Sequence, residues 1–138
     1  MTRSQGSITI SDARLPIVDV VYEGEPAADE YRRAFAEYAR IASAGTPVAY
    51  LIDMRTFDPL GITADKRRAA SEVFKQYEHR LAAVSVAEAR VITSPITRGI
   101  VTAFDWLTSA NKWPCRQFAS RDEGERWLRE QLSARPRR

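Results

Sequence analysis

The sequence predicts a single α/β domain with a mixed, mostly parallel sheet of four to five strands, covered by about four helices. Its 138 residues match the size of one ordinary domain. Strand-like and helix-like runs alternate in the order β-β-α-β-α-β-α-β-α, which calls for right-handed crossovers between parallel strands. Residues 48–54 are almost continuously apolar, as is typical of a central strand covered on both faces.

Two strands are expected at the start of the chain. Residues 8–10 and 15–22 are rich in isoleucine and valine, whose β-branched side chains favour strands. Residues 11–14 between them are polar or small, so we expect a turn there and an antiparallel hairpin at the edge of the sheet.

The first helix is predicted from Pro26 to Ser43. Pro26 suits the first turn of a helix, where a missing N–H costs nothing, and Gly45 is expected as a left-handed cap. Apolar residues at three- and four-residue spacing form the predicted buried stripe: Tyr31, Ala34, Phe35, Tyr38, Ile41 and Ala42.

A second helix is predicted to begin after Thr63, its N-cap residue, with the acidic Asp65 in the first turn. The predicted apolar stripe of this helix is Ala70, Val73, Phe74, Tyr77 and Leu81. Residues 83–93 are expected to form the next strand, although Glu88 and Arg90 interrupt its apolar character.

The last three elements are marked by capping residues. Ser94 and Pro95 open a third helix, and residues 115–119 form a short final strand. Ser120 and Glu123 then have the spacing of a capping box, which starts the last helix.

The excess of basic over acidic residues lies at the C-terminus. The formal net charge is +3, but without Arg135, Arg137 and Arg138 the 18 remaining basic residues balance 18 acidic ones. Because a nucleic-acid-binding domain needs a basic excess on its folded part, no nucleic-acid partner is expected. We expect three segments: a disordered N-terminal segment at 1–6, the domain at 7–133 and a basic tail at 134–138.

Membrane and secretory segments are not apparent. No run of about 18 apolar residues occurs, so no membrane span is expected. The first residues lack the pattern of a secretory signal, and we therefore expect a cytoplasmic protein. Cys115 is the only cysteine, which excludes an internal disulfide and indicates a small buried thiol.

The residue types that support catalysis are scarce. His79 is the only histidine and is predicted on the polar face of a helix. Any Ser/His/acid or Cys/His arrangement would need His79, which is expected to be a solvated surface residue. No cluster with metal-ligand spacing and no glycine-rich phosphate loop is found, so we expect no metal, no cofactor and no enzymatic activity.

One candidate binding site follows the central strand. Asp53 and Arg55 are expected at its carboxyl end, where open α/β sheets bind ligands and partners. Thr63 places a hydroxyl at a helix N-terminus, where added negative charge is favoured. The alternative is structural: Asp53 bonds turn amides and Thr63 only caps the helix.

Arg98 is a second candidate. It is predicted in the first turn of the third helix, where a cation opposes the helix dipole, so a specific partner is expected. An internal ion pair with Asp53 is the favoured partner, and an external anion is the alternative.

Two tryptophans are the third candidate. Trp106 and Trp113 flank the loop 108–114. They either pack over this loop, as large aromatic side chains usually do, or expose an interaction patch.

Several segments, in this order and spacing, resemble the small SpoIIAA-like proteins of the STAS and CRAL-TRIO-like group. The resemblance covers about residues 15–132. It rests on Leu15–Val18 with Gly24, Val48–Arg55, Ser94–Gly99, Trp106–Leu107, Arg116–Glu123 and Trp127–Leu128. It implies a STAS-like sheet with packed helices, and many members of this group have no assigned activity.

The resemblance extends to bacterial anti-sigma-factor antagonists. These bind a kinase partner and are switched by phosphorylation of a serine at a helix N-terminus after an Asp-ended strand. Their Asp-Ser-Ser-Gly type of motif is absent here, and Thr63 is the hydroxyl in the matching helix-cap setting. Thr63 is therefore the candidate phosphorylation site.

We accordingly predict a non-enzymatic regulatory or protein-binding module with a kinase or sensor protein as partner. The alternative is a small-molecule or lipid carrier that holds its ligand between helices and sheet, with Arg98 at the mouth of the cavity. A homodimer through the Trp113 loop or an exposed strand edge is also compatible with the sequence.

Overall fold

The computed structural model describes residues 6–108 and 113–134, without the side chains of residues 103–108. The predictions for residues 1–5 and 135–138, and for the Trp106 side chain, lie outside this description. The elements are β1 Ser7–Arg14, β2 Ile17–Gly24, α1 Ala28–Ala42, β3 Val48–Phe57, the 3₁₀ helix η1 Pro59–Gly61, α2 Ala64–Val84, β4 Ser85–Val91, α3 Pro95–Thr108, β5 Cys115–Phe118 and α4 Arg121–Ala134.

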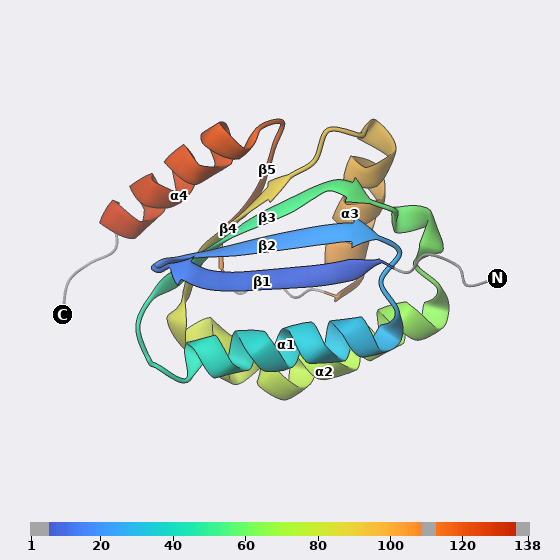
Figure 1. The fold of residues 1–138 in the computed structure, drawn as a ribbon, viewed down its shortest axis with the longest axis horizontal. Coiled ribbons are helices and arrows are strands. Elements are labelled where there is room, and N and C mark those ends of the chain that lie inside the picture. The colour runs from blue at the N-terminus through green and yellow to red at the C-terminus, as the bar shows by residue number, and fades with distance from the viewer. Residues whose placement is uncertain (1–5, 109–112, 135–138) are drawn as a thin grey trace.

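The five strands form one sheet in the order β1-β2-β3-β4-β5. β1 and β2 pair antiparallel, while β2 with β3, β3 with β4, and β4 with β5 pair parallel. In Figure 1, α1 and α2 lie side by side along one face of the sheet, and α4 lies on the other face. The predicted mixed sheet, the element order and the antiparallel hairpin at its edge are all confirmed.

The larger core, which we call the helix-side core, lies between the sheet and helices α1 and α2. Alternate residues of the strands point into it, including Val18, Val20, Tyr50 and Ile52. The α1 stripe was predicted well: all its members except Phe35 are buried, and Phe35 packs against the same core. The hydrophobic burial of this face is what orders the two long helices against the sheet.

The smaller core lies under α4. Small residues on the central strands, such as Ala49 and Ala89, leave room for Trp127 and Leu128 of the helix. Gly124 continues this close approach, since a Cβ placed on it would lie 3.2 Å from the Leu51 side chain and 3.3 Å from the Ala89 side chain. The apolar run of β3 is therefore covered on both faces, as predicted.

Three element boundaries differ from the prediction. The hairpin turn lies at Leu15–Pro16, joined by a cis peptide bond, and residues 11–14 belong to β1 because they continue the ladder with β2. Pro26 is buried before the N-cap residue Ala27 and is not in the first turn of α1. Residues 83–84 complete α2, so β4 is shorter than residues 83–93.

The capping predictions hold. Thr63 accepts a hydrogen bond from the Lys66 amide at 3.3 Å, and Ser94 accepts one from the Thr97 amide at 3.3 Å. Ser120 and the Glu123 amide, 3.2 Å apart, form the N-terminal half of the expected capping box. Gly45 has φ of +77°, the left-handed conformation expected of a helix-ending glycine.

Candidate functional site

Asp53 lies inside β3, not at its end, because the strand continues to Phe57. Asp53 pairs in register with Val91, the last residue of β4, so it marks the carboxyl end of the neighbouring strand instead. The Asp53 side chain points to the α4 face. It accepts hydrogen bonds from the backbone amide of Arg55 at 3.1 Å and from the guanidinium Nη2 of Arg55 at 2.7 Å. Asp53 and Arg55 therefore bind each other along the strand.

Four further members of this group were not expected from the sequence. Arg121 donates to Asp53 at 3.5 Å and to Asp19 at 3.2 Å, so it joins the two carboxylates from the start of α4. Arg14 binds Asp19 at 2.7 Å and Glu125 at 3.0 Å. We call these six residues the charged cluster: Arg14, Asp19, Asp53, Arg55, Arg121 and Glu125.

The carboxylates of the charged cluster are held in their ionised form. The hydrogen bond from Arg55 lowers the pKa of Asp53 below its ordinary value, against the opposing effect of burial. The hydrogen bond from Arg14 likewise lowers the pKa of Asp19. A carboxylate with a lowered pKa, shared between two guanidinium groups, is suited to holding α4 on the sheet rather than to donating a proton.

Two sequence signals pointed to the missed residues. Asp19 is a charged residue between Ile17 and Val21, which share its face of β2. Arg121 is the first residue of α4, a position where a cation opposes the helix dipole. Arg98 is also a cation in the first turn of a helix. At Arg121 this unfavourable position is compensated by ion pairs with Asp19 and Asp53.

Arg98 does not form the expected ion pair with Asp53. Its guanidinium is exposed and lies 3.5 Å from the carbonyl oxygen of Ile92, while Asp53 is occupied by Arg55 and Arg121. The reason is the face of the sheet: Asp53 points toward α4, whereas α3, through Val101, joins the core on the other face. This prediction is wrong.

Thr63 is exposed at the start of α2 and does not contact the charged cluster. The nearby Lys66 binds the carbonyl oxygen of Gly61 at 3.2 Å and the Glu25 carboxylate at 3.4 Å. Asp58 caps η1 by accepting the Leu60 amide at 3.0 Å. These bonds fix the segment between β3 and α2 and leave the Thr63 side chain facing solvent.

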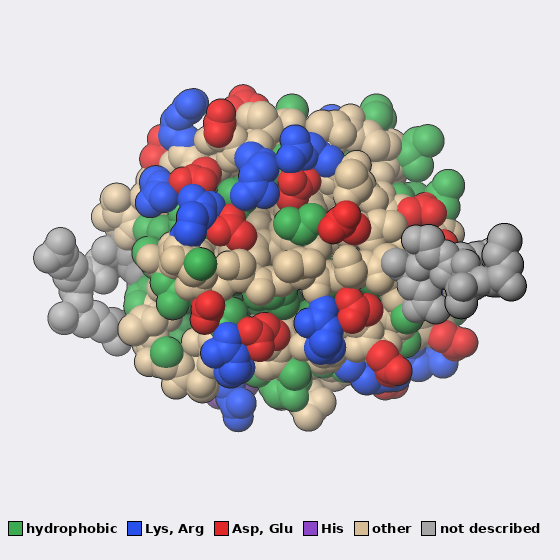
Figure 2. All heavy atoms as spheres, viewed as in Figure 1, with side chains coloured by type: hydrophobic (Ala, Val, Ile, Leu, Met, Phe, Trp, Pro, Cys, Tyr) green, Lys and Arg blue, Asp and Glu red, His purple; other side chains and the backbone are tan. Residues whose placement is uncertain are grey.

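Two large apolar side chains are exposed at this same end of the sheet. Leu60 of η1 is 77% exposed and Ile96 at the start of α3 is 64% exposed. The two elements contact each other, and Figure 2 shows hydrophobic side chains at the right-hand edge, where Figure 1 places η1 and α3. Arg67 in the first turn of α2 and Arg98 in the first turn of α3 are both exposed. We call this surface the carboxyl-end patch: Leu60, Thr63, Arg67, Ile96 and Arg98.

Glu88 and Arg90, which interrupt β4, form an ion pair at 2.6 Å inside the larger core. The indole Nε1 of Trp113 donates to Glu88 at 3.2 Å, and its ring lies 6.1 Å from Tyr50 and 6.3 Å from Phe74. Trp113 therefore packs against the core and is hydrogen-bonded to it. Of the two predicted roles, packing and an exposed interaction patch, the structure shows packing.

Tyr22 and Tyr50 of the same core feel the charge of Glu88. Burial raises the pKa of Tyr22 to about 12, and Glu88 adds to the shift. Burial also raises the pKa of Tyr50 to about 12, although the Tyr50 hydroxyl is bound to Ser85 at 2.7 Å. The helix-side core thus holds several polar groups that are satisfied by one another. Cys115 borders them and is half-buried, with its Sγ 3.8 Å from Glu88, so it is less buried than predicted.

The edge of β1 is partly blocked. Glu30 of α1 accepts the backbone amide of Ile8 at 3.0 Å, and Arg33 donates to the Ile8 carbonyl oxygen. Side chains that occupy edge hydrogen-bonding groups discourage pairing with another strand. This applies to the β1 edge; β5 is the other edge strand of the sheet, and residues 109–112 of the Trp113 loop lie outside the described residues.

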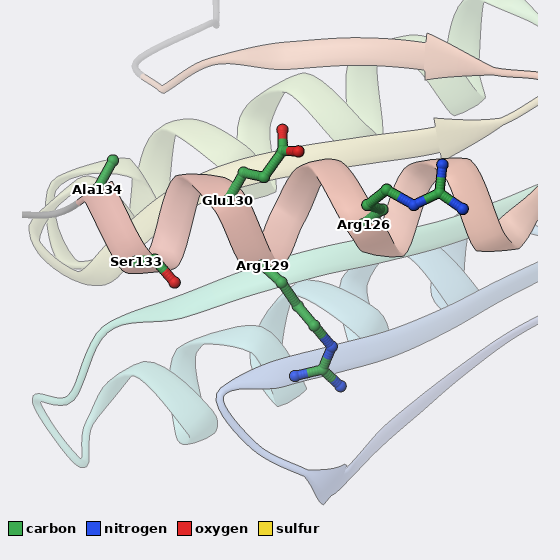
Figure 3. A pocket seen from close by; sticks show the side chains of 5 residues that line it. All are labelled: Arg126, Arg129, Glu130, Ser133 and Ala134. Atoms are coloured by element: carbon green, nitrogen blue, oxygen red, sulfur yellow. The ribbon is translucent and has the colours of Figure 1, made fainter.

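A surface hollow lies along the outer face of α4 (Figure 3). Arg126, Arg129, Glu130, Ser133 and Ala134 line it, and all five come from this one helix. The hollow therefore lies away from the space between helices and sheet that a carrier would use.

Two features are absent from the described part of the chain: a metal-ligand cluster and a membrane-spanning helix. Within it, no three residues of the His, Cys, Asp or Glu types come together as metal ligands, and His79 is exposed as predicted. No described helix combines the length and the apolar character needed to cross a bilayer.

No protein-family model matches the chain, and no curated protein matches it. A solved structure does: an uncharacterised protein of the DUF3478 family, with a SpoIIAA-like fold, from Shewanella loihica PV-4. The two chains share 14% identity with a TM-score of 0.70, and the match covers 93% of this chain and 98% of that one. Together with the sheet order described above, this match shows that the chain has the SpoIIAA-like fold.

Proposed function

We propose that the chain is a non-enzymatic, regulatory protein-binding module of the cytoplasm whose partner docks on the carboxyl-end patch. The observation that carries this proposal is the pair of exposed apolar side chains, Leu60 and Ile96, on two elements that touch. A single exposed leucine needs no explanation, whereas apolar groups gathered with charged neighbours are typical of interaction sites.

The carboxyl-end patch is a better docking surface than the charged cluster around Asp53 and Arg55. The arginines of the cluster bind its carboxylates, so a partner would have to displace existing ion pairs. Arg67 and Arg98 have no carboxylate partner among the residues that the structure describes. We therefore assign the cluster a structural role and place the partner at the patch.

An affinity purification from native cells tests the proposal. The tagged protein is compared with Leu60→Asp plus Ile96→Asp, which places charge in the apolar centre of the patch. Leu15→Asp is the matched control, because Leu15 is 48% exposed but lies at the hairpin turn. We expect mass spectrometry to show a stoichiometric partner with the wild type and the control, and its loss with the double variant. A partner retained equally by all three proteins would place docking elsewhere.

A second candidate function is a small-molecule carrier. The observation in its favour is the polar interior of the helix-side core, where Glu88, Arg90 and Trp113 bond one another among tyrosines. Such groups can orient a ligand in an otherwise apolar site. Native mass spectrometry of the purified protein tests this function: a bound mass that disappears in Trp113→Phe supports a carrier, and ligand-free protein from native cells speaks against it.

A further inference from the structure

We infer that the partner presents an acidic segment with apolar anchors, a class of ligand that the carboxyl-end patch is charged to receive. This inference rests on the proposed function and adds the chemistry of the partner. It comes from the charges around Leu60 and Ile96, not from the apolar residues themselves.

Two of the acids near the patch, Glu25 and Asp65, are ion-paired. The Asp58 carboxylate accepts the Leu60 amide at 3.0 Å, and Asp65 lies 3.4 Å from Arg68. Glu25 lies 3.4 Å from Lys66. Asp65 and Glu25 are therefore compensated by local cations, whereas Asp58 is bonded to a neutral amide and keeps its charge.

Two cations of the patch lack such a match among the described residues. Arg67 is exposed in the first turn of α2 and makes no ion pair with any described residue. Arg98 is exposed in the first turn of α3, and its one described partner is a neutral carbonyl oxygen. Each guanidinium also opposes the dipole of its own helix, so an incoming carboxylate would relieve an unfavourable interaction at both places.

The patch thus combines an apolar centre with two cations that lack counter-charges in the described part of the chain. A nucleic acid would use the cations but not the apolar centre, because its phosphate backbone dominates binding. An acidic protein segment uses both: its apolar side chains cover Leu60 and Ile96, and its carboxylates bind Arg67 and Arg98. Charge complementarity of this kind sets specificity and association rate more than total affinity.

A selection experiment tests the inference without knowledge of the natural partner. A random library of short peptides is selected on the immobilised full-length protein, after peptides that bind Leu60→Asp plus Ile96→Asp have been removed. We expect the recovered peptides to contain more Asp and Glu than Lys and Arg, together with apolar residues.

Charge reversal then tests the two cations directly. Arg67→Glu plus Arg98→Glu is expected to weaken binding of the selected peptides by about tenfold or more, measured by fluorescence anisotropy at low salt. Arg80→Glu is the matched control, because Arg80 is an exposed arginine of α2 in its last turns, far from the patch. The control is expected to bind as the wild type does.

Each other outcome overturns the inference in a distinguishable way. Recovery of neutral or basic peptides that still require Leu60 and Ile96 refutes the acidic partner but leaves the proposed function standing. Unchanged peptide binding by Arg67→Glu plus Arg98→Glu also refutes the acidic partner and leaves the proposed function standing. Binding of anionic vesicles, sensitive to Leu60→Asp plus Ile96→Asp, with no recovered peptide, refutes both the acidic segment and a protein partner at the patch.

Discussion

The indole N–H of Trp113 donates to the carboxylate of Glu88 across 3.2 Å, from the segment before β5 to the middle of β4. Glu88 also binds Arg90 at 2.6 Å. Because Glu88 is only 9% exposed, its charge depends on these partners for compensation. The pair therefore ties the chain that enters β5 to the helix-side core.

Removal of the Glu88 carboxylate should destabilise the protein strongly. Glu88→Ala removes one counter-charge of Arg90 and the acceptor of the Trp113 indole, and breaking a buried ion pair costs about 3–5 kcal/mol. Chemical denaturation measures the free energy of unfolding. Glu72→Ala, a change on the exposed side of α2, should alter it by no more than about 0.5 kcal/mol. Equal stability of the two variants would mean that the buried pair contributes nothing.

The charged cluster predicts a loss of stability in acid. The pKa values of Asp53 and Asp19 are lowered in the folded protein, so their contribution is present above the ordinary value of 3.8. It is lost as the pH falls below that value, because the unfolded chain then binds more protons than the folded one. Denaturation at a series of pH values should show a flatter acid profile for Asp53→Asn than for the wild type.

Asp29→Asn supplies the control for the acid profile. The Asp29 side chain is 93% exposed on α1, so its removal should leave the profile unchanged. At neutral pH, Asp53→Asn should lower the free energy of unfolding by about 2 kcal/mol, the usual scale for a hydrogen bond to a charged group. A steep wild-type profile that Asp53→Asn fails to flatten would assign the effect to other carboxylates.

Two glycines should respond to substitution in opposite directions. A Cβ on Gly124 already meets Leu51 at 3.2 Å, so Gly124→Val should overpack the α4 interface and cost about 2 kcal/mol. Gly99 lies in α3, where a Cβ would meet no other atom within 4 Å, and Gly99→Ala should stabilise the protein by up to about 1 kcal/mol. Thermal unfolding midpoints measure both, and a stabilising Gly124→Val would refute the close packing of α4.

The tyrosines of the helix-side core should ionise late. The pKa values of Tyr22 and Tyr50 are raised to about 12 by burial, against an ordinary value of 10.0. The neutral phenols therefore contribute stability that is present below pH 10.0 and is lost as the pH rises toward 12. Ultraviolet titration of the wild type, Tyr22→Phe and Tyr50→Phe should show that each variant loses a phenol that titrates late. If a variant instead lost a phenol that ionises near pH 10.0, the burial of that tyrosine would be contradicted.

Thr63 allows the cap to be separated from the proposed switch. Thr63→Ala should cost about 1 kcal/mol through loss of the bond to the Lys66 amide, whereas Thr63→Ser should keep it. Thr63→Glu adds negative charge beside Arg67 and should weaken an acidic partner. Equal partner affinity of Thr63→Glu and the wild type would rule out a phosphorylation switch here while leaving the binding role intact.

The order of the elements could be predicted from the sequence because it depends on local patterns. The period of apolar residues along α1 and the continuous apolar run of β3 each follow from which neighbours are buried. Thr63, Ser94 and Ser120 satisfy amides within three residues of themselves. Interactions of such short range are visible in the chain itself, and the structure confirms them.

The partners of the charged residues were decided by tertiary structure. Arg121 lies 68 residues beyond Asp53, and Trp113 lies 25 residues beyond Glu88. Which arginine reaches Asp53 depends on the face of the sheet that each helix covers, and Arg98 lies on the other side from Arg121. The exposure of Leu60 and Ile96 was decided in the same way, since nothing local distinguishes an uncovered apolar residue from a covered one.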